Sequence, residues 1–385
     1  MSGSLADLLL DTLRLAPPSD AQELARRWSS PDVAARADGI AAWIAWEQAE
    51  QWLLRRLTDC GVLASVPPTL AAALQQAARR DAKAGLAVDA DAADALSVLA
   101  EARIPCVLLK GPARRAAAAS LVLGDARMTR DVDVLVRTSD AETAWRLFVA
   151  RGWVPYQYDP AHLPPGETEM RGPSPYHLRT LIRPGRAAVE LHVSIHRDLP
   201  PAVAWDRFSG TAQKISWQGL EVRVPAPTEL LWHALVHARA TSGPGWSLRY
   251  WLDAASVLAA GPVDWDTIVS RLDSGEPPGR TIAARWLSAA TWLAGVHDPT
   301  ACGASTPLAL ERLVAWRLAV LTHRDPNGAW TEKLLDEGTR AEAGLGLAPL
   351  IAGRAWPVRA RRRVATLLAR GVHSGWRLLR GRSKE

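Results

Sequence analysis

The hydrophobic pattern of the chain changes twice along its length, and these changes limit the folds available to it. From Ser4 to about Ala102, apolar residues recur every three to four positions, which is typical of amphipathic helices. Short apolar runs bounded by Gly and Pro follow, and they predict buried strands. Helical spacing returns from Pro227 onward. The sequence therefore predicts an α+β protein, in which a small mixed sheet is flanked by N-terminal and C-terminal helical regions.

The same changes predict four parts. We expect an N-terminal helical region at 1–102, a sheet domain at 103–226, a C-terminal helical domain at 227–353 and a basic amphipathic tail at 354–385. Asp20 and Ser30 are expected to cap helices, and Ser139-Asp140 is expected to cap a helix over 141–150. The predicted strands are 104–109, 132–136, 153–156, 176–182, 187–195 and a hairpin that turns at Gln218-Gly219.

Charge is unevenly distributed along the chain. The net charge is +6, but the segment from Arg354 to Glu385 alone holds ten basic residues and one acidic residue. The basic character therefore belongs to the tail, where apolar side chains are interleaved with arginines, and it does not make the body of the chain a nucleic-acid binder. The tail is predicted either to dock its apolar stripe on the C-terminal helical domain or to bind an acidic peptide or another polyanion.

Cysteine usage and hydropathy suggest where the protein resides. The three cysteines, Cys60, Cys106 and Cys302, are widely spaced and form no C-x-x-C pair, which argues against a disulfide framework or a thiolate zinc site. The first residues carry Asp7 and Asp11 within their apolar stretch, unlike a signal peptide. No apolar run reaches the ~18 residues of a membrane span. We expect a cytoplasmic protein without a membrane span.

Two carboxylates open the second predicted strand. Asp131 and Asp133 lie at positions i and i+2, so they project from the same face of the strand. Adjacent acids are costly unless a positive charge lies between them, and oxygen-rich carboxylate sites suit Mg²⁺. Glu190 interrupts another apolar strand and would complete a triad for two-metal phosphoryl or nucleotidyl transfer if the two strands are neighbours. Lys110-Gly111 ends the first strand, where a backbone can approach a phosphate.

These segments, taken in order, resemble one family. Leu109-Lys110-Gly111, then Arg127–Val136, then Val189–His192 are similar to the bacterial uncharacterised nucleotidyltransferase family of the DNA polymerase beta superfamily. The similarity extends into the helices, through Glu229–His233 and Leu252–Ala255. The resemblance implies a minimal nucleotidyltransferase sheet, with Asp131, Asp133 and Glu190 as catalytic residues that hold Mg²⁺ or Mn²⁺. It also implies that a nucleoside triphosphate is the co-substrate and that the Gly111 turn faces it.

One residue departs from the family pattern. Pro112 follows Gly111, where the superfamily usually has a small hydroxyl residue or Gly, and Pro has no N–H to offer an anion. Phosphate binding is therefore expected to depend on basic side chains. The candidates are Lys110, Arg114, Arg115, Arg127 and Arg130.

The resemblance implies a bacterial enzyme that transfers a nucleoside monophosphate to a hydroxyl of an unknown acceptor, which is a small molecule, a peptide or a natural product. Two alternatives stay open: a phosphotransferase that uses the same site, and a binding module that has kept the fold but lost turnover.

Structural roles for the candidate residues also stay open. Asp131 and Asp133 would then form a solvated strand end capped by Arg127 and Arg130, and Glu190 would be an edge-strand charge. His192 either contacts substrate or packs in the core, and His233 and His237 are expected to pack rather than bind zinc.

Overall fold

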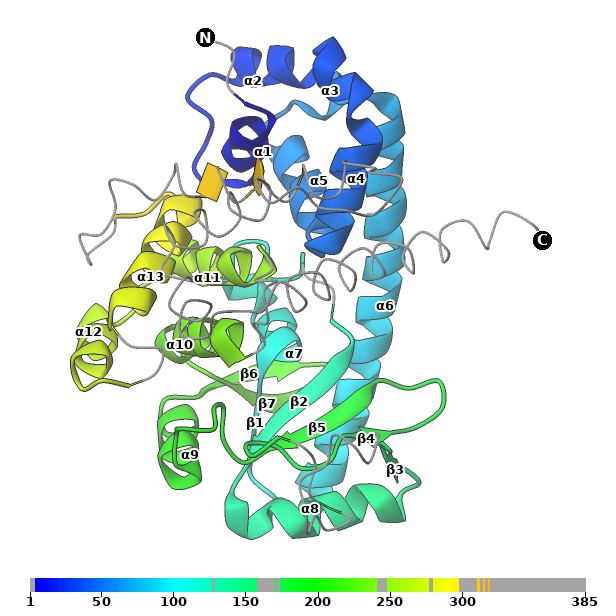
Figure 1. Cartoon of the computed structure of the whole chain (residues 1–385). Coiled ribbons are helices and arrows are strands. Elements are labelled where there is room, and N and C mark those ends of the chain that lie inside the picture. Colours follow the sequence, from blue (N-terminus) through cyan, green and yellow to red (C-terminus); the bar gives the residue numbers. More distant parts are fainter. Residues whose placement is uncertain are drawn as a thin grey trace, which may run out of the picture. The chain divides into compact units, whose positions relative to one another are not determined.

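The computed structural model describes residues 4–126, 129–157, 170, 174–240, 248–276 and 280–297, together with 310, 311, 314, 315 and 318 (Figure 1). The chain divides into two compact units. Unit 1 contains residues 1–75, 242–251 and 279–385, and unit 2 contains residues 76–241 and 252–278. The predicted tail at 354–385 lies outside the described residues. The boundaries predicted between the four parts stay predictions.

Unit 1 is helical, as the periodicity predicts for the first part of the chain. Asp20 caps α2 by accepting hydrogen bonds from two backbone N–H groups, and Ser30 caps α3 with Pro31 in the first turn, which confirms both predicted helix starts. The described elements are α1 (Leu5–Leu13), α2 (Ala21–Trp28), α3 (Pro31–Ala35), α4 (Ala37–Trp46), α5 (Glu50–Asp59), the 3₁₀ turn η1 (Leu63–Ser65), the first turns of α6 (Pro68–Glu101) and α13 (Arg280–Ala294).

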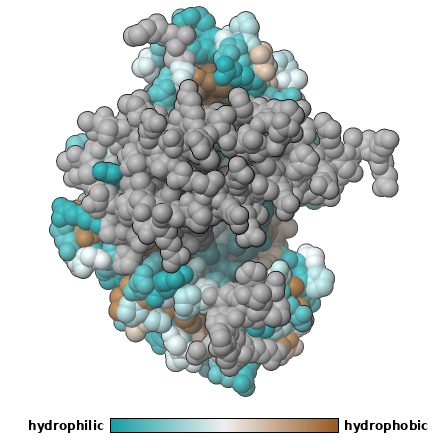
Figure 2. All heavy atoms as spheres, in the orientation of Figure 1, coloured by the Kyte–Doolittle hydropathy of each residue, from teal (hydrophilic) through white to brown (hydrophobic). Residues whose placement is uncertain are grey.

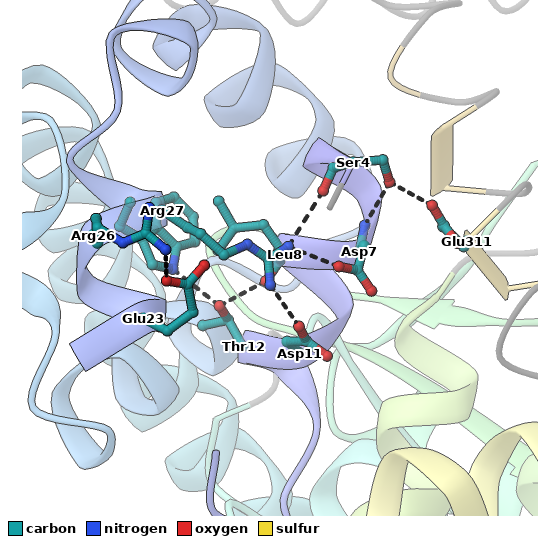
Figure 3. Close-up of polar contacts among 10 residues, drawn as sticks. Ser4, Asp7, Leu8, Asp11, Thr12, Glu23, Arg26, Arg27 and Glu311 are labelled. Atoms are coloured by element: carbon teal, nitrogen blue, oxygen red, sulfur yellow. Dashed lines mark hydrogen bonds and ion pairs between the residues drawn. The ribbon is translucent and has the colours of Figure 1, made fainter. Parts of the chain in front are cut away.

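Polar contacts join the helices of unit 1. Figure 3 shows Arg27 of α2 between two acids of α1, with its guanidinium nitrogens 2.8 Å from both Asp7 Oδ2 and Asp11 Oδ2. Thr12 accepts a hydrogen bond from the indole of Trp28 at 3.0 Å. Ser4 donates to Glu311 at 2.5 Å (Figure 3), so residues more than three hundred positions apart meet in this unit.

Unit 2 is built on a five-stranded sheet with the strand order β1-β2-β5-β4-β3. In Figure 1, β2 and β5 run side by side through its middle. These two strands pair in parallel, whereas the other neighbouring pairs are antiparallel. The sheet is therefore mixed, as predicted. Its strands are β1 (Cys106–Leu108), β2 (Asp131–Val136), β3 (Val154–Pro155), β4 (Leu181–Ile182) and β5 (Ala188–His192).

A separate hairpin follows the sheet in the chain. β6 (Gln213–Trp217) pairs antiparallel with β7 (Leu220–Val224), and β7 lies close to β1. Gln218 and Gly219 both have positive φ, at 52° and 76°, the conformation of a tight two-residue hairpin turn. The predicted turn at these two residues is confirmed.

Helices surround the sheet in unit 2, and one begins differently from the prediction. α8 starts at Thr138, and no side chain caps it, so Ser139 and Asp140 lie in its first turn and the predicted cap is wrong. Arg137, which occupies the capping position, cannot accept a hydrogen bond through its side chain. The helices are the remainder of α6, α7 (Lys110–Ala116), the turn η2 (Ala118–Ser120), α8 (Thr138–Ala150), α9 (Pro201–Gly210), α10 (Pro227–Ala240), most of α11 (Arg249–Ala260) and α12 (Trp265–Asp273).

Where Figure 2 colours the surface by hydropathy, hydrophilic and hydrophobic residues are interleaved. Leu86 and Val154 are the most exposed large apolar side chains among the described residues, at 65% and 50%, and they belong to different elements. Scattered apolar side chains at a surface need no functional explanation. Across the described residues, none of the helices is both long enough and apolar enough to cross a membrane.

Candidate active site

Parallel pairing of β2 with β5 brings the predicted carboxylates together. Asp133 lies opposite Glu190 in the register, and Asp131 lies opposite Ala188. Because positions i and i+2 of a strand share a face, Asp131, Asp133, Glu190 and His192 all belong to one face of the sheet. The two strands are neighbours, as the triad hypothesis required.

Asp133 is the centre of the cluster. Its side chain is fully buried, and Oδ1 accepts hydrogen bonds from Lys110 Nζ at 2.5 Å and from His192 Nε2 at 2.8 Å. The other oxygen, Oδ2, is also buried but has no hydrogen-bond partner among the described residues. A buried polar atom without a partner is costly, and such atoms often mark the position of a ligand. Asp133 therefore has an unused ligand atom inside the protein.

Glu190 faces the same cations from the neighbouring strand. Its Oε2 lies 3.6 Å from Lys110 Nζ and 3.6 Å from His192 Nε2. Its Oε1 accepts a hydrogen bond from the Thr180 hydroxyl at 3.1 Å, which fixes the orientation of the carboxylate. Two acids and two nitrogen-bearing side chains thus converge from β2, β5 and the end of β1.

Lys110 reaches the carboxylates through an unusual backbone conformation. The Leu109 N–H donates to the Asp133 carbonyl at 2.9 Å, so the chain stays in the sheet up to this residue. Lys110 then has φ of 50°, in the left-handed region that a side chain rarely adopts, and α7 begins there. Such conformations persist where the surroundings enforce them, and they concentrate at functional sites.

Gly111 has a packing role that the sequence did not predict. A Cβ atom on this residue would lie 2.5 Å from Thr129 Oγ1, closer than any real contact. Only glycine therefore fits between α7 and the segment that leads into β2. Thr129 Oγ1 is buried and has no hydrogen-bond partner within the described part of the chain.

The charges of the cluster shift each other's pKa values. Burial alone would lower the pKa of Lys110, but Asp133 and Glu190 outweigh burial and hold it above its ordinary value. Burial would raise the pKa of Glu190, but the nearby His192 ring and the charge of Lys110 bring it well below its ordinary range. Burial and the charge of Lys110 would lower the pKa of His192, but its hydrogen bond to Asp133 and the nearby Glu190 carboxylate outweigh them and raise it. The positive charge of Lys110 and the negative charges of Asp133 and Glu190 therefore stabilise one another.

The predicted arginines lie in different surroundings. Arg114 is buried and donates to the Asp253 carbonyl at 2.6 Å, and Arg115 forms a two-pronged pair with Asp89 at 2.6 and 2.7 Å. These contacts give both side chains structural partners in α11 and α6. Arg130 is exposed and its charge acts on Asp81, whereas Arg127 lies outside the described residues.

Among the described residues, one group of His, Cys, Asp and Glu side chains could hold a metal ion, and it consists of Asp133, Glu190 and His192. Their ligand atoms all lie within 4.8 Å of one another. Asp131 is not in this group, although its charge raises the pKa of Lys110. His233 and His237 are not in it either; their rings contact at 5.9 Å, and the His233 ring meets Phe208 edge-on at 5.8 Å.

The sequence did not predict the contacts that Lys110, Thr180 and His192 make with the two carboxylates. Lys110 Nζ lies beside Asp133 and Glu190, and its expected contact with a phosphate stays a prediction. The sequence allowed two roles for His192, contact with substrate or packing in the core. In the structure His192 is fully buried, and its ring lies beside the carboxylates. The two-residue spacing of Glu190 and His192 was the available signal, because it places both on one face of the strand.

Comparison with known proteins gives one match. A model of the uncharacterised nucleotidyltransferase family matches residues 34–290, which include every described residue of the cluster. The chain belongs to this family. No curated protein and no solved structure matches it.

Proposed function

We propose that this protein is a metal-dependent nucleotidyltransferase that transfers a nucleoside monophosphate from a nucleoside triphosphate to a hydroxyl of an acceptor. The observation that carries the proposal is the pairing of buried Asp133 with half-buried Glu190, in which Asp133 Oδ2 has no partner in the described part of the chain. Membership of the nucleotidyltransferase family supports it.

The donor set of the cluster fits a divalent metal ion. Carboxylate oxygens are the ligands that Mg²⁺ and Mn²⁺ prefer, and buried Asp133 Oδ2 is available to one. We propose that Asp131, Asp133 and Glu190 hold Mg²⁺ or Mn²⁺. When bound, such ions polarise the phosphoryl group and activate the attacking hydroxyl.

Each remaining residue of the proposed site has a role of its own. Thr180 orients Glu190 through its hydrogen bond to Oε1. Lys110 neutralises the carboxylates, and its ammonium group is within reach of any phosphate that binds at them. We propose that Lys110, Gly111, Arg127 and Arg130 contact the triphosphate. Arg114 and Arg115 are left out, because they are engaged with Asp253 and Asp89.

The acceptor is proposed only as a hydroxyl compound: a small molecule, a peptide or a natural product. We propose a cytoplasmic location, which the free thiols of Cys60 and Cys106 support. The tail at 354–385 is proposed to bind an acidic peptide or another polyanion, because arginines and apolar residues alternate there.

Radiolabelled triphosphates test the reaction. The full chain is incubated with Mg²⁺ or Mn²⁺, a cell extract as the source of acceptor, and each of the four triphosphates labelled at the α- or the γ-phosphate. Transfer of the α-label with release of pyrophosphate is the expected result. Transfer of the γ-label would instead show a phosphotransferase, and no transfer or hydrolysis of any label would favour a binding module.

Substitution of the carboxylates tests the site. Asp131→Asn and Asp133→Asn should each reduce transfer on the order of a thousandfold, because a catalytic metal ion contributes several kcal/mol to transition-state stabilisation. Asp140→Asn, in the first turn of α8, is the matched control and should retain activity. Full activity in either site variant would contradict the proposal.

A further inference from the structure

His192 is positioned to do more than pack against the carboxylates. We propose that its Nε2 is a metal ligand alongside Asp133 and Glu190, and that the resulting set of one nitrogen and two carboxylates selects Mn²⁺ over Mg²⁺. This inference deepens the proposed function, since it concerns the metal ion of the same site and rests on that site's being a metal centre.

The distances suit a single ion. His192 Nε2 lies 2.8 Å from Asp133 Oδ1 and 3.6 Å from Glu190 Oε2. Two ligand atoms that bind one ion at adjacent positions, each with a bond of about 2.1 Å, are themselves about 3 Å apart. The three side chains therefore need only small adjustments to bind the same ion.

The orientation of the imidazole is that of a ligating histidine. Its Nδ1 lies 3.3 Å from the Ser194 carbonyl oxygen, to which Nδ1–H can donate. This contact leaves Nε2 directed at the carboxylates, and metal-bound histidines usually make such a hydrogen bond through the other ring nitrogen. The ring is fully buried and lies 5.2 Å from the His177 ring and 6.0 Å from the Tyr176 ring. When Nε2 binds a metal ion, its proton passes to the solvent.

A second observation points independently to a ligand at this position. Asp133 Oδ2 is buried without a partner in the described residues, although Oδ1 of the same carboxylate has two. A carboxylate in a purely structural cluster would be stabilised by sharing its donors between both oxygens. The unpartnered oxygen lies in the same cluster as His192 Nε2, so both are available to one ion.

The donor types decide which ion is favoured. Mg²⁺ prefers oxygen ligands and keeps several waters, whereas imidazole suits first-row transition metals. Mn²⁺ accepts carboxylates as readily as Mg²⁺ does and tolerates a nitrogen ligand. We therefore expect the full chain, without nucleotide, to bind Mn²⁺ at least tenfold more tightly than Mg²⁺.

Metal titration with matched variants tests the assignment. Mn²⁺ and Mg²⁺ affinities are measured by calorimetry for the wild type, His192→Ala, His192→Asp and His177→Gln. His192→Ala should lose at least tenfold in Mn²⁺ affinity while its Mg²⁺ affinity changes little, and His192→Asp should shift the preference toward Mg²⁺. His177→Gln, which alters the neighbouring ring, should keep the wild-type preference. Equal Mn²⁺ affinities for the wild type and His192→Ala would overturn the proposal.

A spectroscopic measurement on the wild type does not depend on the folding of any variant. Pulsed electron paramagnetic resonance of the Mn²⁺-loaded protein should show coupling to a directly bound ¹⁴N nucleus, and absence of that coupling would overturn the assignment. Both measurements are made without nucleotide, so their outcome is separate from that of the transfer assay. Nitrogen-coupled Mn²⁺ in a protein that transfers nothing would support the metal site and contradict the proposed reaction.

Discussion

Two buried ion-pair sites in unit 2 differ in how they use the oxygens of their carboxylates. Glu229 of α10 and Arg271 of α12 form a two-pronged pair, in which each Glu229 oxygen accepts from one guanidinium nitrogen, and Arg271 also stacks on Trp232 at 5.4 Å. At Asp133, Lys110 and His192 both bond to Oδ1, and Oδ2 has no partner among the described residues. Both carboxylate oxygens of Glu229 therefore have a hydrogen-bond partner, whereas Asp133 Oδ2 has none among the described residues. Under the proposed function, this difference separates an ion pair with a structural role from a cluster that binds a metal ion.

The largest effect on stability is expected at the pair between α10 and α12. Glu229→Gln leaves the buried Arg271 charge without its counter-charge and should reduce the free energy of unfolding by about 3 kcal/mol, measured by urea denaturation. The half-buried Glu276–Arg207 pair provides the control, and Glu276→Gln should cost about 1 kcal/mol or less. Transfer activity per folded molecule should survive both changes. Loss of activity without loss of stability in Glu229→Gln would break the comparison.

A smaller effect is expected from removing the ammonium group at the site. Lys110→Met should tighten Mn²⁺ binding about tenfold in the absence of nucleotide, because a nearby positive charge no longer repels the ion or competes for Asp133. Calorimetry measures the change, with Lys214→Met on the exposed hairpin as the control. Weaker Mn²⁺ binding in Lys110→Met would show that the ammonium group organises the carboxylates rather than competing for them.

The smallest effect concerns Asp81, another buried carboxylate in unit 2. Its Oδ1 has no hydrogen-bond partner in the described part of the chain, and Arg80 Nε is 3.6 Å away. Burial raises the pKa of Asp81 above its ordinary 3.8, so ionisation of Asp81 costs more free energy in the folded state than in the unfolded chain. Asp81→Asn should therefore raise stability at pH 7 by less than Glu229→Gln lowers it. The gain should vanish as the pH falls below 3.8, and urea denaturation across a pH series checks both points.

The sequence predicts the parts of the fold that local chemistry determines. The helix starts at Asp20 and Ser30 and the hairpin turn at Gln218-Gly219 were correct, because each depends on capping or turn residues within a few positions. The predicted cap of α8 was wrong, since Thr138, Ser139 and Asp140 follow one another and each is a possible helix start. α9, which begins at Pro201, was not predicted, although Pro in the first turn was a usable signal.

The candidate site is predictable only in part. Alternation along a strand places Asp131 with Asp133 and Glu190 with His192, and the family resemblance suggests that the two strands are neighbours. The sequence does not predict that the Lys110 side chain points toward Asp133 and Glu190, because the positive φ of Lys110 is imposed by the surrounding structure. The engagement of Arg114 and Arg115 with Asp253 and Asp89 likewise depends on contacts between residues distant in the chain.

The parallel pairing of β2 with β5 has a consequence for synthesis of the protein. Asp133 meets Glu190 only after the chain has passed through α8, β3 and β4 and returned to the sheet. Contacts between residues so far apart in sequence form slowly, because loop closure must precede them. A nascent chain on the ribosome that has not yet exposed residue 192 therefore holds Asp133 without its partner strand. The proposed metal site therefore cannot form before β5 has joined the sheet.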